Sequence, residues 1–140
     1  MSYIELAERL YETNHGMLSA YSYQPIVDHF SNADDRVQVD EDDYQGDTFV
    51  AWLDASGFSL LIFGWGSCSG CDALQACGSY AEVATLIERL ENDIRRFESG
   101  ATLLAYLDSD ECKGNYQSYH GAWPGFVAQV KDWVAAKAGE

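Results

Sequence analysis

The sequence predicts an α+β fold in which a small antiparallel sheet packs against helices. Apolar residues recur at helical spacing near both ends of the chain and again after residue 79. Between residues 48 and 65 they instead form two short runs separated by a turn. The 140 residues are 47% hydrophobic and 14% aromatic, enough to bury the core of a single domain over residues 1–140.

The N-terminal region predicts a helix over residues 2–13. Ser2 and Glu5 form a capping box, and apolar residues then follow at helical spacing until about residue 11. Pro25 is suited to the first turn of a short second helix that ends near Phe30.

The sheet is predicted to contain a hairpin over residues 48–65. Its strands, 48–54 and 58–65, are joined by a turn in which Gly57 is expected to take a positive φ. The second strand is apolar on both faces, so we expect it to be internal in the sheet. Alternating polar and apolar residues at 36–39 predict an edge strand.

Two long helices are predicted after the hairpin. The first covers residues 80–98, with a cap formed by Ser79 and Glu82, and Gly100 is expected to end it. Residues 102–107 fit either a strand or a short helix, and their leucine spacing favours the helix. The last helix is predicted over residues 124–137, beginning at a proline.

The net charge of −15 predicts the class of partner. The first 47 residues contain eleven acidic residues but only Arg9 and Arg36, a net charge of −9. Such a surface repels nucleic acids and anionic lipids and attracts basic proteins, so we expect a basic protein partner. The centre of the partner-facing surface is predicted at Asp34, Asp35, Asp40, Glu41, Asp42 and Asp43. A solubility role for these charges, with an aromatic surface at Tyr116, Tyr119 and Trp123 binding the partner, is the alternative.

The chain carries neither a signal-peptide pattern nor an apolar run long enough to span a membrane. We therefore expect a cytoplasmic protein, in which thiols stay reduced. Its four cysteines are then expected to bind a metal or to take part in redox chemistry before they form disulfides.

Three cysteines lie close together after the predicted 58–65 strand, at Cys68, Cys71 and Cys77. A Cys-x-x-Cys turn with a third nearby thiolate predicts a zinc site, which needs one more ligand. His120 lies among aromatic residues and is favoured, whereas Cys112, between Glu111 and Lys113, has the surroundings of an exposed polar loop.

Two other interpretations of the same cysteines remain open. A Cys-x-x-Cys pair after an apolar strand is also typical of thiol oxidoreductases, with Cys68 and Cys71 as the redox pair. Asp72 argues against this, because a neighbouring carboxylate raises the pKa of a thiol. Alternatively, the cysteines simply pack as small apolar side chains.

Tyr44-Gln-Gly-Asp and the run Phe63-Gly-Trp-Gly-Ser-Cys-Ser-Gly-Cys-Asp-Ala-Leu-Gln resemble a group of small acidic proteins from bacteria and their phages. The resemblance covers roughly residues 44–98 and implies no activity. It implies a phage-borne origin, and small acidic phage proteins commonly inhibit host enzymes that bind nucleic acids. We therefore expect a zinc-stabilised binding protein rather than an enzyme.

Overall fold

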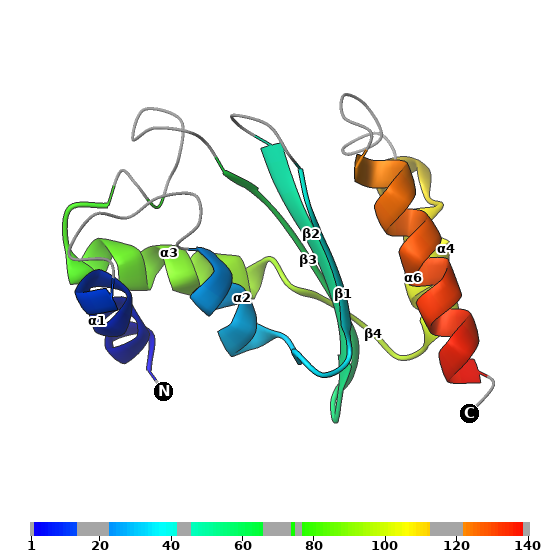
Figure 1. The fold of residues 1–140 in the computed structure, drawn as a ribbon, viewed down its shortest axis with the longest axis horizontal. Coiled ribbons are helices and arrows are strands. Elements are labelled where there is room, and N and C mark those ends of the chain that lie inside the picture. Colours follow the sequence, from blue (N-terminus) through cyan, green and yellow to red (C-terminus); the bar gives the residue numbers. More distant parts are fainter. Residues whose placement is uncertain are drawn as a thin grey trace.

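A four-stranded antiparallel sheet lies between two layers of helices (Figure 1). The computed structural model describes residues 2–13, 23–41, 46–65, 74, 77–112 and 122–138. One layer contains α1 (Tyr3–Thr13), α2 (Gln24–Phe30) and α3 (Tyr80–Asn92), and the other contains α4 (Gly100–Leu107) and α6 (Ala122–Ala138). The predicted α+β class is confirmed.

The strands follow one another across the sheet in chain order. They are β1 (Arg36–Asp40), β2 (Gly46–Asp54), β3 (Gly57–Trp65) and β4 (Arg95–Phe97), and each pairs antiparallel with the next. The prediction that β1 is an edge strand and that β3 is internal is confirmed. One helical layer covers each face of the sheet, so both faces of the inner strands β2 and β3 are covered.

Each face of the sheet has its own hydrophobic core, because successive side chains of a strand point to opposite faces. The first core, under α1, α2 and α3, contains Leu6, Ala7, Leu10, Tyr23, Ile26, Val27, Val50, Trp52, Leu61, Phe63, Leu74, Val83, Leu86, Ile87 and Leu90. The second core, under α4 and α6, contains Val37, Phe49, Ala51, Leu60, Leu103, Leu107, Cys112, Trp123, Phe126 and Val130.

The β2–β3 hairpin closes through a two-residue turn at Ala55 and Ser56. Asp54 Oδ1 accepts hydrogen bonds from the Ser56 N–H at 2.9 Å and from its hydroxyl at 2.6 Å. Gly57 has the predicted positive φ, 108°, and a Cβ there would lie 3.0 Å from the Phe97 carbonyl oxygen. Glycine at this position therefore permits both the turn and the approach of β4.

The predicted helix over residues 80–98 is wrong in its last part. α3 begins as predicted, with the Ser79 hydroxyl accepting from the Glu82 N–H at 3.2 Å, but it ends at Asn92. Residues 95–97 instead form β4, in which Phe97 pairs with Phe58 of β3. Strand pairing satisfies backbone groups at the edge of β3 that a longer helix would leave without partners.

Gly100 does not end a helix but begins α4. A Cβ built on Gly100 would overlap the Cγ1 atom of Val134 in α6. The absence of a side chain at this position therefore lets the two helices of the second layer approach each other closely.

None of the helices in the described ranges combines the length and apolar character needed to cross a membrane.

Candidate metal centre and acidic surfaces

The C-terminal end of the cysteine segment is held against the first core. The Leu74 side chain is fully buried there, and its N–H donates to the Tyr23 hydroxyl at 3.2 Å. The Cys77 N–H donates to the Leu74 carbonyl at 3.1 Å, and the Cys77 carbonyl accepts from the Tyr11 hydroxyl at 2.9 Å. These hydrogen bonds connect the predicted ligand Cys77 to helix α1.

Cys77 is half-buried and packs against the first core. Burial raises the pKa of Tyr11, and the nearby Cys77 and Glu82 raise it further. The Tyr11 hydroxyl therefore stays protonated and remains a donor to the Cys77 carbonyl. The other predicted ligands Cys68, Cys71 and His120 lie outside the described residues.

The charged neighbours of Cys112 predicted an exposed loop, but the structure buries this residue. It is 0% exposed and belongs to the second core, and its N–H donates to the Ser109 hydroxyl at 3.2 Å. Burial raises the pKa of the Cys112 thiol, although a hydrogen bond with Tyr106 and the charge of Arg95 oppose the rise. The thiol is therefore protonated near neutral pH and packs as a small apolar group.

The positions of Cys77 and Cys112 exclude them as ligands of one zinc ion. Zinc–sulfur bonds are about 2.3 Å long, so two ligating sulfurs must lie within a few ångströms of each other. Cys77 packs on the first core and Cys112 lies in the second, and the sheet separates the two. Of the two predicted candidates for the fourth ligand, His120 remains. Among the residues that the structure describes, no three His, Cys, Asp or Glu side chains form a metal-binding group.

The predicted acidic surface is only partly exposed. Asp34 and Asp40 are exposed, and Asp42 and Asp43 lie outside the described residues. The Asp35 side chain is 24% exposed because Oδ1 accepts from Trp133 Nε1 at 2.9 Å and lies 2.6 Å from Lys137 Nζ.

Glu41 is 6% exposed, and its carboxylate accepts from the Asp47 N–H at 2.7 Å. The Glu41 N–H in turn donates to the Asp47 carbonyl at 3.1 Å, which closes the end of the β1–β2 pair. Contacts within the protein therefore hold the carboxylates of both Asp35 and Glu41, and their place on a partner-facing surface stays a prediction.

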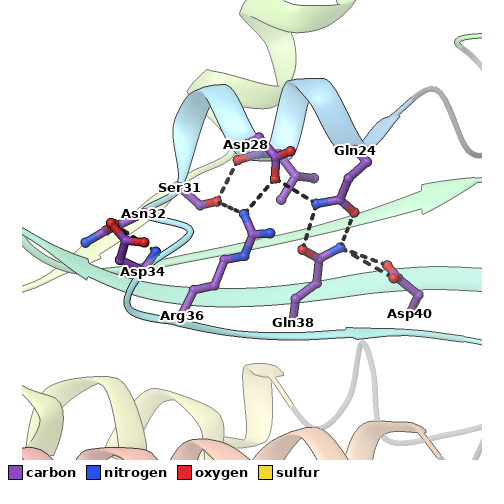
Figure 2. Close-up of polar contacts among 9 residues, drawn as sticks. Gln24, Asp28, Ser31, Asn32, Asp34, Arg36, Gln38 and Asp40 are labelled. Carbon is purple, nitrogen blue, oxygen red and sulfur yellow. Dashed lines mark hydrogen bonds and ion pairs between the residues drawn. The ribbon is translucent and has the colours of Figure 1, made fainter.

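A polar network joins β1 to α2 (Figure 2). Asp28 accepts from Arg36 Nη1 at 2.8 Å and from Gln24 Nε2 at 2.9 Å. The amides of Gln24 and Gln38 exchange two hydrogen bonds, at 3.1 and 2.8 Å. Burial raises the pKa of Asp28, but the hydrogen bonds from Gln24 and Arg36 outweigh it and hold that pKa below its usual value.

A second acidic surface lies on α1 and α3, which pack side by side. Tyr3 at one end of α1 donates to Glu91 at 2.7 Å, and Tyr11 at the other end contacts the Tyr80 ring edge-on, with centroids 4.9 Å apart. The hydrogen bond to Glu91, with burial and the charges of Glu91 and Glu88, raises the pKa of Tyr3 to about 12.

We call this surface the acidic ridge. Its exposed carboxylates belong to Glu5, Glu8, Glu12, Glu82, Glu88 and Asp93, and its exposed arginines are Arg9 and Arg89. The spacing of Glu5, Glu8 and Glu12 on one helical face was visible in the sequence. The contribution of α3 was not, because only the packing of α3 against α1 brings the two sets together.

One residue of the predicted aromatic surface, Trp123, is buried. Trp123 is 4% exposed and packs in the second core, with its ring centroid 5.6 Å from that of Phe49. Tyr116 and Tyr119 lie outside the described residues.

No protein-family model matches the sequence, and searches of curated proteins and of solved structures found no similar protein. The resemblance to small acidic proteins of bacteria and phages stays a prediction.

Proposed function

We propose that the protein is an acidic binding protein that recognises a basic protein partner, in the manner of small phage inhibitors of nucleic-acid-binding enzymes. The observation that supports this proposal is the acidic ridge, in which six exposed carboxylates outnumber two arginines. The net charge of −15 adds a long-range field of the same sign. Such a field speeds association with a basic surface and opposes binding to nucleic acids.

The carboxylates on α1 form a row along one side of the helix. With a rise of about 1.5 Å per residue, Glu5 and Glu8 are separated by about 4.5 Å along the helix axis, and Glu8 and Glu12 by about 6 Å. Lysines and arginines that bind phosphates also form charge-assisted hydrogen bonds with carboxylates, so a basic cleft can pair with these glutamates.

We further propose that zinc, bound by Cys68, Cys71, Cys77 and His120, stabilises the segment that supports the ridge. The support for this part is the sequence pattern of the cysteines together with the hydrogen bond from Tyr11 to the Cys77 carbonyl. Tyr11 belongs to α1, so a metal ion that fixes the position of Cys77 also helps to fix the position of α1.

Charge reversal on α1 tests the partner-binding proposal. The Glu5→Lys/Glu8→Lys/Glu12→Lys variant and the wild type would be immobilised and exposed to a nuclease-treated host lysate. We expect the wild type to retain basic proteins that added DNA displaces and moderate salt elutes, and the ridge variant to lose them. The matched control is Asp42→Lys/Asp43→Lys with Asp34→Lys, which changes the same number of charges at residues that belong to neither α1 nor α3.

Equal capture by the wild type and the ridge variant would contradict the ridge as the binding surface. Loss of capture in the control variant alone would instead assign binding to the partner-facing surface that the sequence predicts around Asp34, Asp42 and Asp43. Circular dichroism of all three proteins verifies that the substitutions leave the fold intact.

A further inference from the structure

β1 forms one edge of the sheet in the part of the chain that the structure describes, and its hydrogen-bond pattern shows which residues line that edge. The Leu53 N–H donates to the Asp35 carbonyl and the Glu41 N–H to the Asp47 carbonyl, both at 3.1 Å. Bonded pairs alternate along an antiparallel ladder, so odd-numbered residues from 35 to 41 bond to β2. The backbone groups of Arg36, Gln38 and Asp40 therefore point away from the sheet.

The outward N–H and C=O groups of these three residues have no hydrogen-bond partner among the described residues. The strand contains neither proline nor a bulge, since all five of its residues pair one-to-one with β2. Proline and bulges are among the features that protect an edge strand, and the two charges of β1, Arg36 and Asp40, have opposite signs and stand at its two ends. This edge is consequently a template for another strand.

The sequence of β1 is complementary to itself when two copies run antiparallel. It reads Arg36-Val-Gln-Val-Asp40, so pairing about Gln38 places Arg36 opposite Asp40 of a second copy at both ends. Gln38 then lies opposite its own equivalent, and Val37 lies opposite Val39. Opposite charges and matched apolar residues in directly facing positions stabilise a strand pair.

The outward backbone groups select this register. In a two-fold pairing, the outward groups of Arg36, Gln38 and Asp40 bond only to residues of the second copy whose backbone groups also point outward. The register can therefore change only by two residues at a time, which moves the two-fold centre by one residue. The pairing centred on Gln38 keeps all five residues of the strand in the ladder. Shifting the centre to Val37 or Val39 removes strand residues from the pairing and separates Arg36 from Asp40.

The side chains are already held in place for such a contact. Arg36 Nη1 donates to Asp28 at 2.8 Å and to Ser31 at 2.9 Å, which leaves other N–H groups of the guanidinium for a second carboxylate (Figure 2). Asp40 is exposed, and its carboxylate accepts from the Thr48 hydroxyl at 2.6 Å. A guanidinium has five N–H donors and a carboxylate several acceptor positions, so each side chain can add a contact to those it already makes.

We propose that the protein forms a two-fold dimer in which the β1 strands of two copies pair antiparallel about Gln38 and join their sheets into one. This proposal is independent of the proposed function, because the acidic ridge lies on α1 and α3 and not at the β1 edge. The two interactions also differ in their response to salt. Screening weakens binding of a basic partner but strengthens association of two chains that each carry −15.

Sedimentation velocity of the full chain over a range of concentrations tests the dimer. Gln38→Pro removes the central outward N–H, whereas the matched control Gln38→Ala keeps it and removes only the side chain. We expect the wild type and Gln38→Ala to dimerise, more strongly at higher salt, and Gln38→Pro to remain monomeric. A wild type that stays monomeric at all concentrations, or dimers that are unaffected by Gln38→Pro, would overturn the proposal.

A pair of charge variants tests the register. Arg36→Glu alone and Asp40→Lys alone each bring like charges opposite one another at both ends, so each should weaken its own dimer by about tenfold or more. Mixing the two variants restores opposite charges at both ends, and we expect a mixed dimer. Absence of the mixed dimer, with both variants folded by circular dichroism, contradicts this register. The wild type could instead be monomeric and bind a basic partner that Gln38→Pro does not bind. That result would show that the edge binds a different protein and not a second copy.

Discussion

Lys137, near the end of α6, contacts Asp35, which lies in the turn that leads into β1. The distance between Lys137 Nζ and Asp35 Oδ1 is 2.6 Å. The Trp133 indole N–H donates to the same oxygen at 2.9 Å. These contacts attach the last helix to the edge of the sheet. They also show why the charge of a residue did not predict its exposure.

Asp35→Asn should lower the free energy of unfolding by about 1–2 kcal/mol, because it removes the charge from hydrogen bonds made by Lys137 and Trp133. Chemical denaturation followed by tryptophan fluorescence measures the change. Asp34→Asn, at the exposed neighbouring position, is the control and should change stability by less than about 0.5 kcal/mol. Equal effects of the two substitutions would mean that the ion pair contributes nothing measurable.

Stability should fall in acid as Asp35 is protonated. Burial raises the pKa of Asp35, but hydrogen bonds from Lys137 and Trp133 and the charge of Lys137 outweigh it and hold the pKa below its usual value. A carboxyl with a lowered folded pKa stabilises the fold above its unfolded value of about 3.9, and that stability is lost as pH falls through the folded pKa. The wild type should therefore have a higher free energy of unfolding than Asp35→Asn at neutral pH, and this difference should shrink below about pH 4. Chemical denaturation at neutral and at progressively lower pH measures it. A difference that persists in acid would contradict the assignment.

Gly100→Ala should destabilise the protein by about 1–3 kcal/mol, because the added methyl group overlaps Val134 and separates α4 from α6. Gly125→Ala in α6 is the matched control, since a Cβ there has no heavy atom within 4 Å. The control should stabilise the helix by about 0.5–1 kcal/mol. Thermal unfolding of the two variants should therefore shift in opposite directions, and a neutral Gly100→Ala would show that the helices can separate freely.

Purified protein should contain about one zinc ion per chain, measured by elemental analysis. Cys71→Ser and Cys77→Ser should reduce the zinc content and lower the melting temperature, because metal affinity contributes directly to folding. Cys112→Ala should retain the zinc, since its thiol lies in the second core. Protein that is free of metal and unchanged in stability by chelation would contradict the zinc proposal.

The thiol oxidoreductase alternative makes the opposite prediction for the same residues. Reduction of insulin disulfides that is abolished by Cys68→Ser would support the enzyme, because a thiolate that is bound to zinc is a poor nucleophile. We expect no turnover in this assay with the wild type.

The sequence alone determined the elements whose signals are local. Gly57 marked the hairpin turn because only a residue without a Cβ takes that φ freely, and Ser79 marked the start of α3 because its hydroxyl caps nearby N–H groups. Alternation over residues 36–39 identified β1 because successive side chains of a strand face opposite sides.

Only the tertiary structure decided the features that depend on residues far apart in the chain. Residues 95–97 fit a helical pattern, yet they form β4 because the edge of β3 offers backbone partners that no local pattern records. Cys112 has charged neighbours but is buried, and Asp35 is acidic but lies against Lys137, because α4 and α6 pack on the second face of the sheet. Burial and ion pairing are properties of that packing, so composition and periodicity could not predict them.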